Sequence, residues 1–111
     1  MNPYIIPGIR REPSLRHYYS IFLKSFPDAK VRKRKREIVR SRQIFMYLMW
    51  KHEVDSLTNI GKVCGGYDHS TVIHARDVIQ DEIDMNYRDT VEKVELLERK
   101  FNEEKKNFCK H

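Results

Sequence analysis

The residues best suited to chemistry in this 111-residue chain are consecutive. Asp68, His69, Ser70 and Thr71 are short polar side chains that between them can donate and accept hydrogen bonds. His69 and His74 are five residues apart and do not share a helix face, and no cysteine or carboxylate stands at ligand spacing from them. We therefore expect no metal site. We expect His69 to contact another molecule and His74 to be partly buried and bonded within the fold.

The same region offers little support for catalysis. The carboxylates Asp81, Glu82 and Asp84 have the character of a solvated face, not of an acid/base pair. No order of serine, histidine and aspartate suggests a nucleophilic triad on a helical chain. We predict that the chain is not an enzyme and needs no cofactor.

Two helices and a glycine turn must position the polar run. Apolar residues recur at helical spacing over Leu57–Val63, and Gly65 and Gly66 then end the helix because glycine readily takes positive φ. Asp68 can cap the second helix. This layout is typical of a helix-turn-helix, whose second helix enters the major groove of DNA. A capped surface helix in an ordinary helical hairpin is the alternative. The expected apolar face of the second helix is Val72, Ile73, Ala75, Val78 and Ile79.

Charge is distributed unevenly along the chain. Residues 1–52 hold 13 basic and 3 acidic residues, whereas residues 53–111 hold 9 basic and 13 acidic ones. The basic half suggests a polyanionic partner. Its densest part is KVRKRKR at residues 30–36. This run predicts a loop that contacts DNA phosphates or reaches into the minor groove of DNA. A solvated charge run is the alternative.

The other segments predict an all-α helix bundle around the helix-turn-helix. Residues 1–13 form an extended arm rich in proline, and residues 14–88 form the DNA-binding domain. Within it, Ser14 caps a helix that Pro27 ends, and Glu37–Glu53 is the central core helix, with Trp50 among its apolar residues. The second helix of the helix-turn-helix continues to about Tyr87. The arm is expected to be pinned to the domain by Tyr4, Ile5, Ile6 and Ile9.

Residues 89–111 hold a charged C-terminal helix with a narrow apolar stripe. Tyr87, Val94, Phe101 and Phe108 recur every seven residues, as in a coiled-coil seam. We favour packing of this stripe on the chain's own first helix over a weak homodimer.

The two cysteines, Cys64 and Cys109, fit no metal or redox spacing. Cys64 stands where an apolar residue is needed, so we expect a buried thiol in a reducing, cytoplasmic compartment. No apolar run approaches membrane-spanning length, and the prolines near the N-terminus do not fit a signal peptide.

The segment GGYDHSTVIHA at residues 65–75, with Ile60-Gly61 before it and RxRQ at Arg40–Gln43, resembles the C-terminal DNA-binding domain of DnaA, the bacterial chromosomal replication initiator. The resemblance runs from about Lys30 to Ile83, and the helix at residues 14–26 looks like the connector helix of that domain. It implies an all-helical fold similar to Trp repressor and binding to a short A·T-rich box in duplex DNA.

The resemblance also implies roles for particular residues. Arg36 matches an arginine that enters the minor groove. Asp68, His69 and Thr71 match base-contacting residues, with Ser70 at a Ser/Thr position beside them. Leu57 and Thr58 match positions where the family's backbone contacts phosphate, whereas Lys62 lies nearby without a matching family contact. With the basic loop added, the predicted DNA-binding residues are Arg32, Lys33, Arg34, Lys35, Arg36, Arg40, Arg42, Leu57, Thr58, Lys62, Tyr67, Asp68, His69, Ser70 and Thr71.

The chain also departs from the family. Tyr67 stands where an arginine or lysine is usual, Ser41 replaces a proline, and Trp50 stands where lysine is common. There is no GxxxxGK[ST] loop, so no nucleotide is expected in this chain. We expect a stand-alone DNA-binding module or a fragment that acts in replication initiation or its regulation. The alternatives are a prophage or mobile-element transcriptional regulator, and a helical protein-interaction module that docks through its C-terminal stripe.

Overall fold

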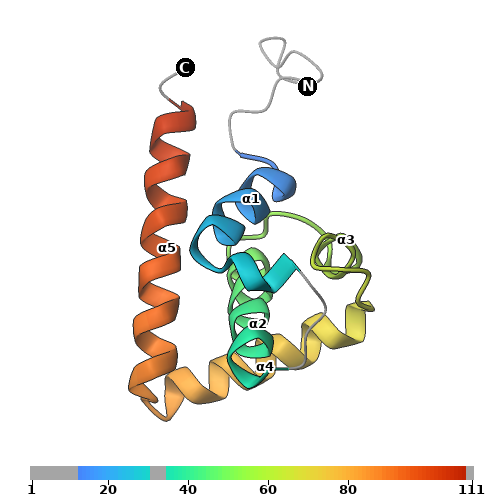
Figure 1. Ribbon diagram of the computed structural model, residues 1–111, viewed down its shortest axis with the longest axis vertical. Helices are drawn as coiled ribbons and strands as arrows, with labels where there is room; N and C mark the ends of the chain where they lie inside the picture. Colours follow the sequence, from blue (N-terminus) through green and yellow to red (C-terminus); the bar gives the residue numbers. More distant parts are fainter. Residues whose placement is uncertain (1–12, 31–34, 110–111) are drawn as a thin grey trace.

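The computed structural model describes residues 13–30 and 35–109, and this part of the chain is all-α, as predicted. Its elements in order are α1 (Leu15–Ser25), the 3-10 turn η1 (Pro27–Lys30), α2 (Arg36–Lys51), α3 (Leu57–Val63), α4 (His69–Asp84) and α5 (Arg88–Cys109) (Figure 1). The predicted anchoring residues of the N-terminal arm lie outside the described residues.

The helix ends follow local sequence signals. Ser14 caps α1 by accepting a hydrogen bond from the His17 backbone N–H at 3.2 Å, and α1 stops before Pro27. The predicted first helix is therefore confirmed. The second helix of the helix-turn-helix ends at Asp84, earlier than the predicted Tyr87, because the chain turns at Asn86 with a φ of 56°.

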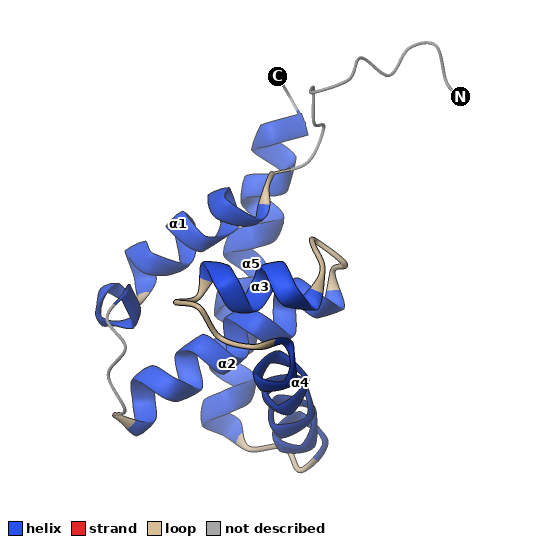
Figure 2. Cartoon of the chain, turned by 90° about the vertical axis from the view of Figure 1, so that its right-hand side faces the viewer, coloured by secondary structure: helices blue, strands red, loops and turns tan. Residues whose placement is uncertain are grey.

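The core is built around α2, which crosses α4 and lies against α1 and α5 (Figures 1 and 2). Phe45 is fully buried, and its ring packs on Phe22 of α1 at 4.9 Å and on Phe101 of α5 at 6.1 Å between centroids. Such aromatic pairs stabilise the fold by more than the burial of their apolar area alone would. One residue of α2 departs from the predicted core, because Trp50 is 37% exposed.

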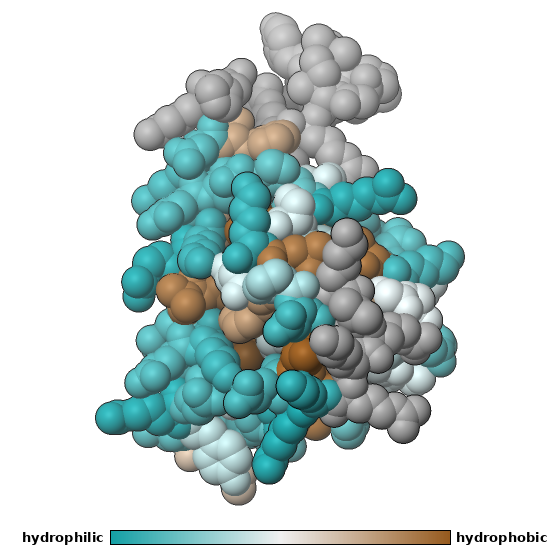
Figure 3. Space-filling view, in the orientation of Figure 1, coloured by the Kyte–Doolittle hydropathy of each residue, from teal (hydrophilic) through white to brown (hydrophobic). Residues whose placement is uncertain are grey.

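The stripe of α5 packs inside the chain, as we favoured. Val94, Leu97 and Phe101 are buried, and the Phe101 ring meets Tyr18 of α1 edge-on at 5.0 Å. The Lys100 ammonium donates to the Ser25 hydroxyl at 2.6 Å, which ties the two helices at their surface. The face shown in Figure 3, which includes the outer side of α5, is mostly hydrophilic. Tyr87, which opens the predicted heptad seam, is exposed and takes no part in this packing.

Cys64 is 2% exposed, as predicted, and burial raises the pKa of its thiol to about 12, despite the opposing effect of the nearby Arg42. It is therefore an unreactive packing residue. Among the described residues, no group of three or more potential ligands could hold a metal ion. No described helix has the length and apolar character needed to cross a membrane.

Candidate nucleic-acid interface

The predicted helix-turn-helix is present as α3, a glycine turn and α4. Gly65 and Gly66 have φ of 127° and 79°, so both use the conformational freedom of glycine. Gly61 allows the turn to lie directly on α3: a Cβ there would stand 2.2 Å from the carbonyl oxygen of Tyr67. The Tyr67 N–H donates to the Gly61 carbonyl at 2.9 Å. The turn therefore fixes α4 against α3.

Asp68 organises the first turn of α4. One carboxylate oxygen accepts from the His69 N–H at 2.8 Å, and the other accepts from the Ser70 hydroxyl at 2.8 Å. The ring Nδ1 of His69 lies 2.9 Å from the first oxygen. The hydrogen bond from Ser70, followed by that from the His69 backbone, lowers the pKa of Asp68. The cap thus holds an ionised carboxylate and orients both neighbours.

These cap residues are presented to solvent. Asp68, His69 and Ser70 are exposed, while Thr71 is half-buried at the edge of the helix. An exposed first turn with fixed donors and acceptors is the arrangement by which a recognition helix reads base edges. On α3, Leu57 is half-buried, whereas Thr58 and Lys62 are exposed.

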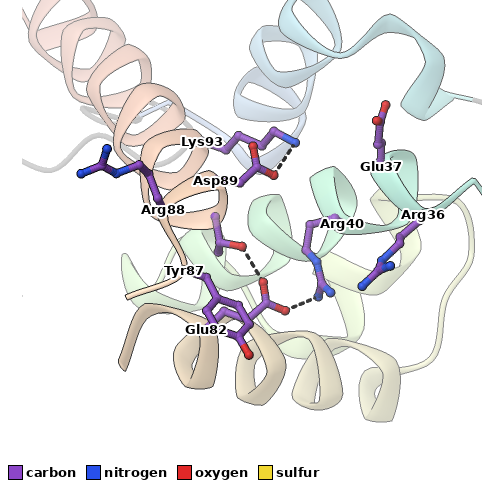
Figure 4. A pocket seen from close by; sticks show the side chains of 9 residues that line it. Arg36, Glu37, Arg40, Glu82, Tyr87, Arg88, Asp89 and Lys93 are labelled. Atoms are coloured by element: carbon purple, nitrogen blue, oxygen red, sulfur yellow. Dashed lines mark hydrogen bonds and ion pairs between the residues drawn. The ribbon is translucent and has the colours of Figure 1, made fainter. Parts of the chain in front are cut away.

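The described end of the basic segment, Lys35 and Arg36, lies near the C-terminal end of α4, away from the first-turn residues. Arg32, Lys33 and Arg34 fall outside the described residues, and Lys35 and Arg36 are exposed at the start of α2. Arg36 lines a surface cleft of about 490 Å³ with the C-terminal part of α4 and the start of α5 (Figure 4).

Arg40 was predicted to bind DNA, but its guanidinium is engaged within the fold. It forms an ion pair with Glu82 of α4 at 2.8 Å and donates to Gln43 at 2.8 Å. Glu82 also accepts from the hydroxyl of Thr90 on α5 (Figure 4). The side chain of Glu82 is only 12% exposed, so it is not part of the solvated acidic face that the sequence suggested. This network joins α2, α4 and α5.

Arg42, also predicted to bind DNA, is buried. It is 4% exposed, and its guanidinium carbon lies 5.6 Å from the centre of the half-buried Tyr67 ring. In this conformation the guanidinium packs beneath the turn that precedes α4.

The expectation for His74 was wrong, because its side chain is exposed on α4. A helical wheel would have revealed this. At 100° per residue, His74 lies far from the direction shared by the buried Val72, Ala75 and Ile79.

The family described as "Bacterial dnaA protein helix-turn-helix" matches residues 20–79. The chain is 38% identical over 79 residues to the chromosomal replication initiator protein DnaA of Porphyromonas gingivalis, covering 69% of this chain and 17% of that protein. It is 44% identical over 71 residues to the DnaA of Bacteroides fragilis, covering 62% of this chain and 15% of that protein. No solved structure gives a significant match.

The chain thus spans about a sixth of the length of these relatives. The family match includes all of α2, α3 and the glycine turn, together with the exposed first turn of α4. The chain belongs to the bacterial DnaA family of DNA-binding helix-turn-helix domains.

Proposed function

We propose that this protein binds a specific duplex DNA sequence of the DnaA-box type and acts in replication initiation or its regulation. The observation that carries the proposal is the first turn of α4, where Asp68 holds His69 and Ser70 in fixed positions at the surface. Asp68 can accept from a cytosine amino group, and His69 can bond a base edge or a phosphate. The relatives' name supports the link to chromosomal replication initiation.

The spacing of the two ends of α4 supports a second contact in another groove. His69 and Glu82 are 13 positions apart on one helix, or about 20 Å along its axis. Arg36 and Glu82 line the same cleft. The major groove is only about 12 Å wide, so we expect Arg36 to act beyond the groove that holds His69. A narrow A·T-rich minor groove attracts arginine through its enhanced negative potential.

A transcriptional regulator would use the same contacts, and the target sequence would distinguish it from a replication factor. The interaction-module alternative is less well supported, because the α5 stripe that it requires is buried against α1 and α2.

The test is selection of bound sites from random duplex DNA, followed by affinity measurements on the selected and a scrambled site at several salt concentrations. We expect an A·T-rich consensus. A matched variant with Arg32, Lys33, Arg34 and Lys35 all changed to alanine should bind both DNAs more weakly. Its salt slope should fall by about 0.9 for each phosphate that is no longer neutralised. Equal affinity of the wild type for selected and scrambled DNA would contradict sequence-specific binding.

Arg36→Ala tests the second groove. It should cost more affinity on A·T-rich than on G·C-rich flanks, whereas equal losses would make Arg36 an ordinary phosphate contact.

A further inference from the structure

The only tryptophan of the chain lies at the surface, near the C-terminal end of α2. Trp50 is 37% exposed, whereas the preceding residues Leu48 and Met49 are fully buried. The guanidinium carbon of Arg76, from α4, lies 5.2 Å from the centre of its ring, within the range of a cation–π interaction. The ring of Tyr47 lies 5.9 Å away. Trp50 and Arg76 are called the stacked pair below.

The stacked pair connects two parts of the proposed DNA interface. Trp50 and Leu57 line one surface pocket of about 460 Å³, and Leu57 opens α3, where we predict a phosphate contact. Arg76 follows His69 by seven residues, which is almost two helical turns. Arg76 therefore lies on the same side of α4 as His69, about 10 Å further along the axis.

The guanidinium of Arg76 keeps donors for an external ligand. Its Nε donates to Asp77 at 3.0 Å. Within the described residues no hydrogen bond engages its two terminal nitrogens. A guanidinium presents its donors as a planar fork that matches a phosphate. Stacking on the indole of Trp50 restricts the orientation of this guanidinium before a phosphate binds, so less side-chain entropy is lost on binding.

The other charged groups nearby favour Arg76 as the donor. Lys51 is engaged by Glu98 at 2.9 Å, and Asp55 accepts from the backbone N–H of Ser56 at 2.7 Å. The exposed carboxylates of Glu53 and Asp77 lower the net positive charge of this surface. We therefore expect this surface to bind a single phosphate of the DNA backbone, and not several consecutive phosphates.

We propose that the stacked pair binds one backbone phosphate of duplex DNA beside the start of α3, with Arg76 as the donor and Trp50 as the platform that orients it. The inference rests on the proposed function and adds a contact that neither residue was predicted to make.

Tryptophan emission and DNA binding can be followed in one titration, with fluorophore-labelled selected duplex observed by anisotropy. We expect the emission of Trp50 to change with the same midpoint as the anisotropy.

Arg76→Gln should weaken binding to selected and scrambled duplex alike, by about eightfold at 0.1 M salt. When the salt concentration rises from about 50 to about 200 mM, the affinity of Arg76→Gln should fall by a factor that is about 3.5-fold smaller than the factor for the wild type. This difference is the effect of one phosphate contact. Arg99→Gln, at an exposed arginine of α5, is the matched control and should bind like the wild type.

Two further variants separate this contact from a structural role. Arg76→Lys keeps a cation and should retain the salt slope. Trp50→Leu should weaken binding less than Arg76→Gln, and the double variant should bind like Arg76→Gln alone, because the platform acts through the arginine.

If the wild type binds DNA while the tryptophan emission stays constant and Arg76→Gln keeps the wild-type salt slope, the inference is wrong and the proposed function stands. Failure of the wild type to bind any duplex would overturn both.

Discussion

The arginines in the middle of α2 and the first turn of α4 were both predicted to touch DNA, yet the fold treats them in opposite ways. Arg42 is enclosed under Tyr67, and Arg40 is paired with Glu82. His69 and Ser70 are exposed and are held by Asp68. Cationic type alone therefore does not tell which side chains the fold leaves exposed. What distinguishes the two regions is whether the charge is used to hold helices together or is left at the surface.

The largest effect should come from the buried arginine. Arg42→Ala removes a nearly enclosed side chain and its stack on Tyr67, so the free energy of unfolding should fall by about 3 kcal/mol. Urea unfolding measures this decrease. Arg42→Met, which keeps much of the volume without the charge, is the control and should be destabilised less. A variant of normal stability with much weaker DNA binding would show that Arg42 is a DNA contact after all.

His69 should show the reverse pattern. His69→Ala should cost about 2 kcal/mol of binding free energy on the selected site and leave stability within about 0.5 kcal/mol of the wild type, because the side chain is exposed. Anisotropy on selected and scrambled duplex separates the two effects. His74→Ala, at the other exposed histidine of α4, serves as the control. An equal loss for His69→Ala on both DNAs would mean that His69 does not read sequence.

The contrast also shows what the sequence could predict. The four longer helices, the glycine turn and the caps at Ser14 and Asp68 followed from apolar spacing and short polar residues, which act within a few positions of the chain. The first-turn site was predictable for the same reason, and its exposure agrees with that prediction without testing it.

The contacts of Arg40 and Arg42 in α2 depend on distant segments of the chain. Arg40 forms an ion pair with Glu82, and the Arg42 guanidinium lies over the Tyr67 ring. Both partners come from other parts of the chain. No periodicity within α2 reveals those partners. Trp50 has an apolar side chain on a core helix, and its partner Arg76 lies on another helix, α4.

A smaller effect is expected at the ion pair between α2 and α4. A double-mutant cycle of Arg40→Ala and Glu82→Ala should give a coupling of about 1 kcal/mol in the free energy of unfolding, because both side chains are largely enclosed. Arg40→Lys is the control for charge without the planar guanidinium. If the coupling is absent and Arg40→Ala instead lowers the salt slope of DNA binding by about 0.9, the arginine belongs to the interface.

The smallest effect on stability, and the most specific effect on recognition, should come from Asp68→Asn. Asparagine also caps helices well, so unfolding at neutral pH should change little. The hydrogen bonds from Ser70 and from the His69 backbone lower the pKa of Asp68 below its ordinary value of 3.8. The carboxylate therefore contributes stability above that ordinary value, and the contribution is lost as the pH falls through the lowered folded-state pKa. Any difference in melting temperature between the wild type and Asp68→Asn should accordingly shrink in acid.

For recognition, a carboxylate accepts from cytosine, whereas an asparagine side chain pairs with adenine. Site selection with Asp68→Asn should replace a cytosine by an adenine at one position of the consensus, and an unchanged consensus would limit Asp68 to capping.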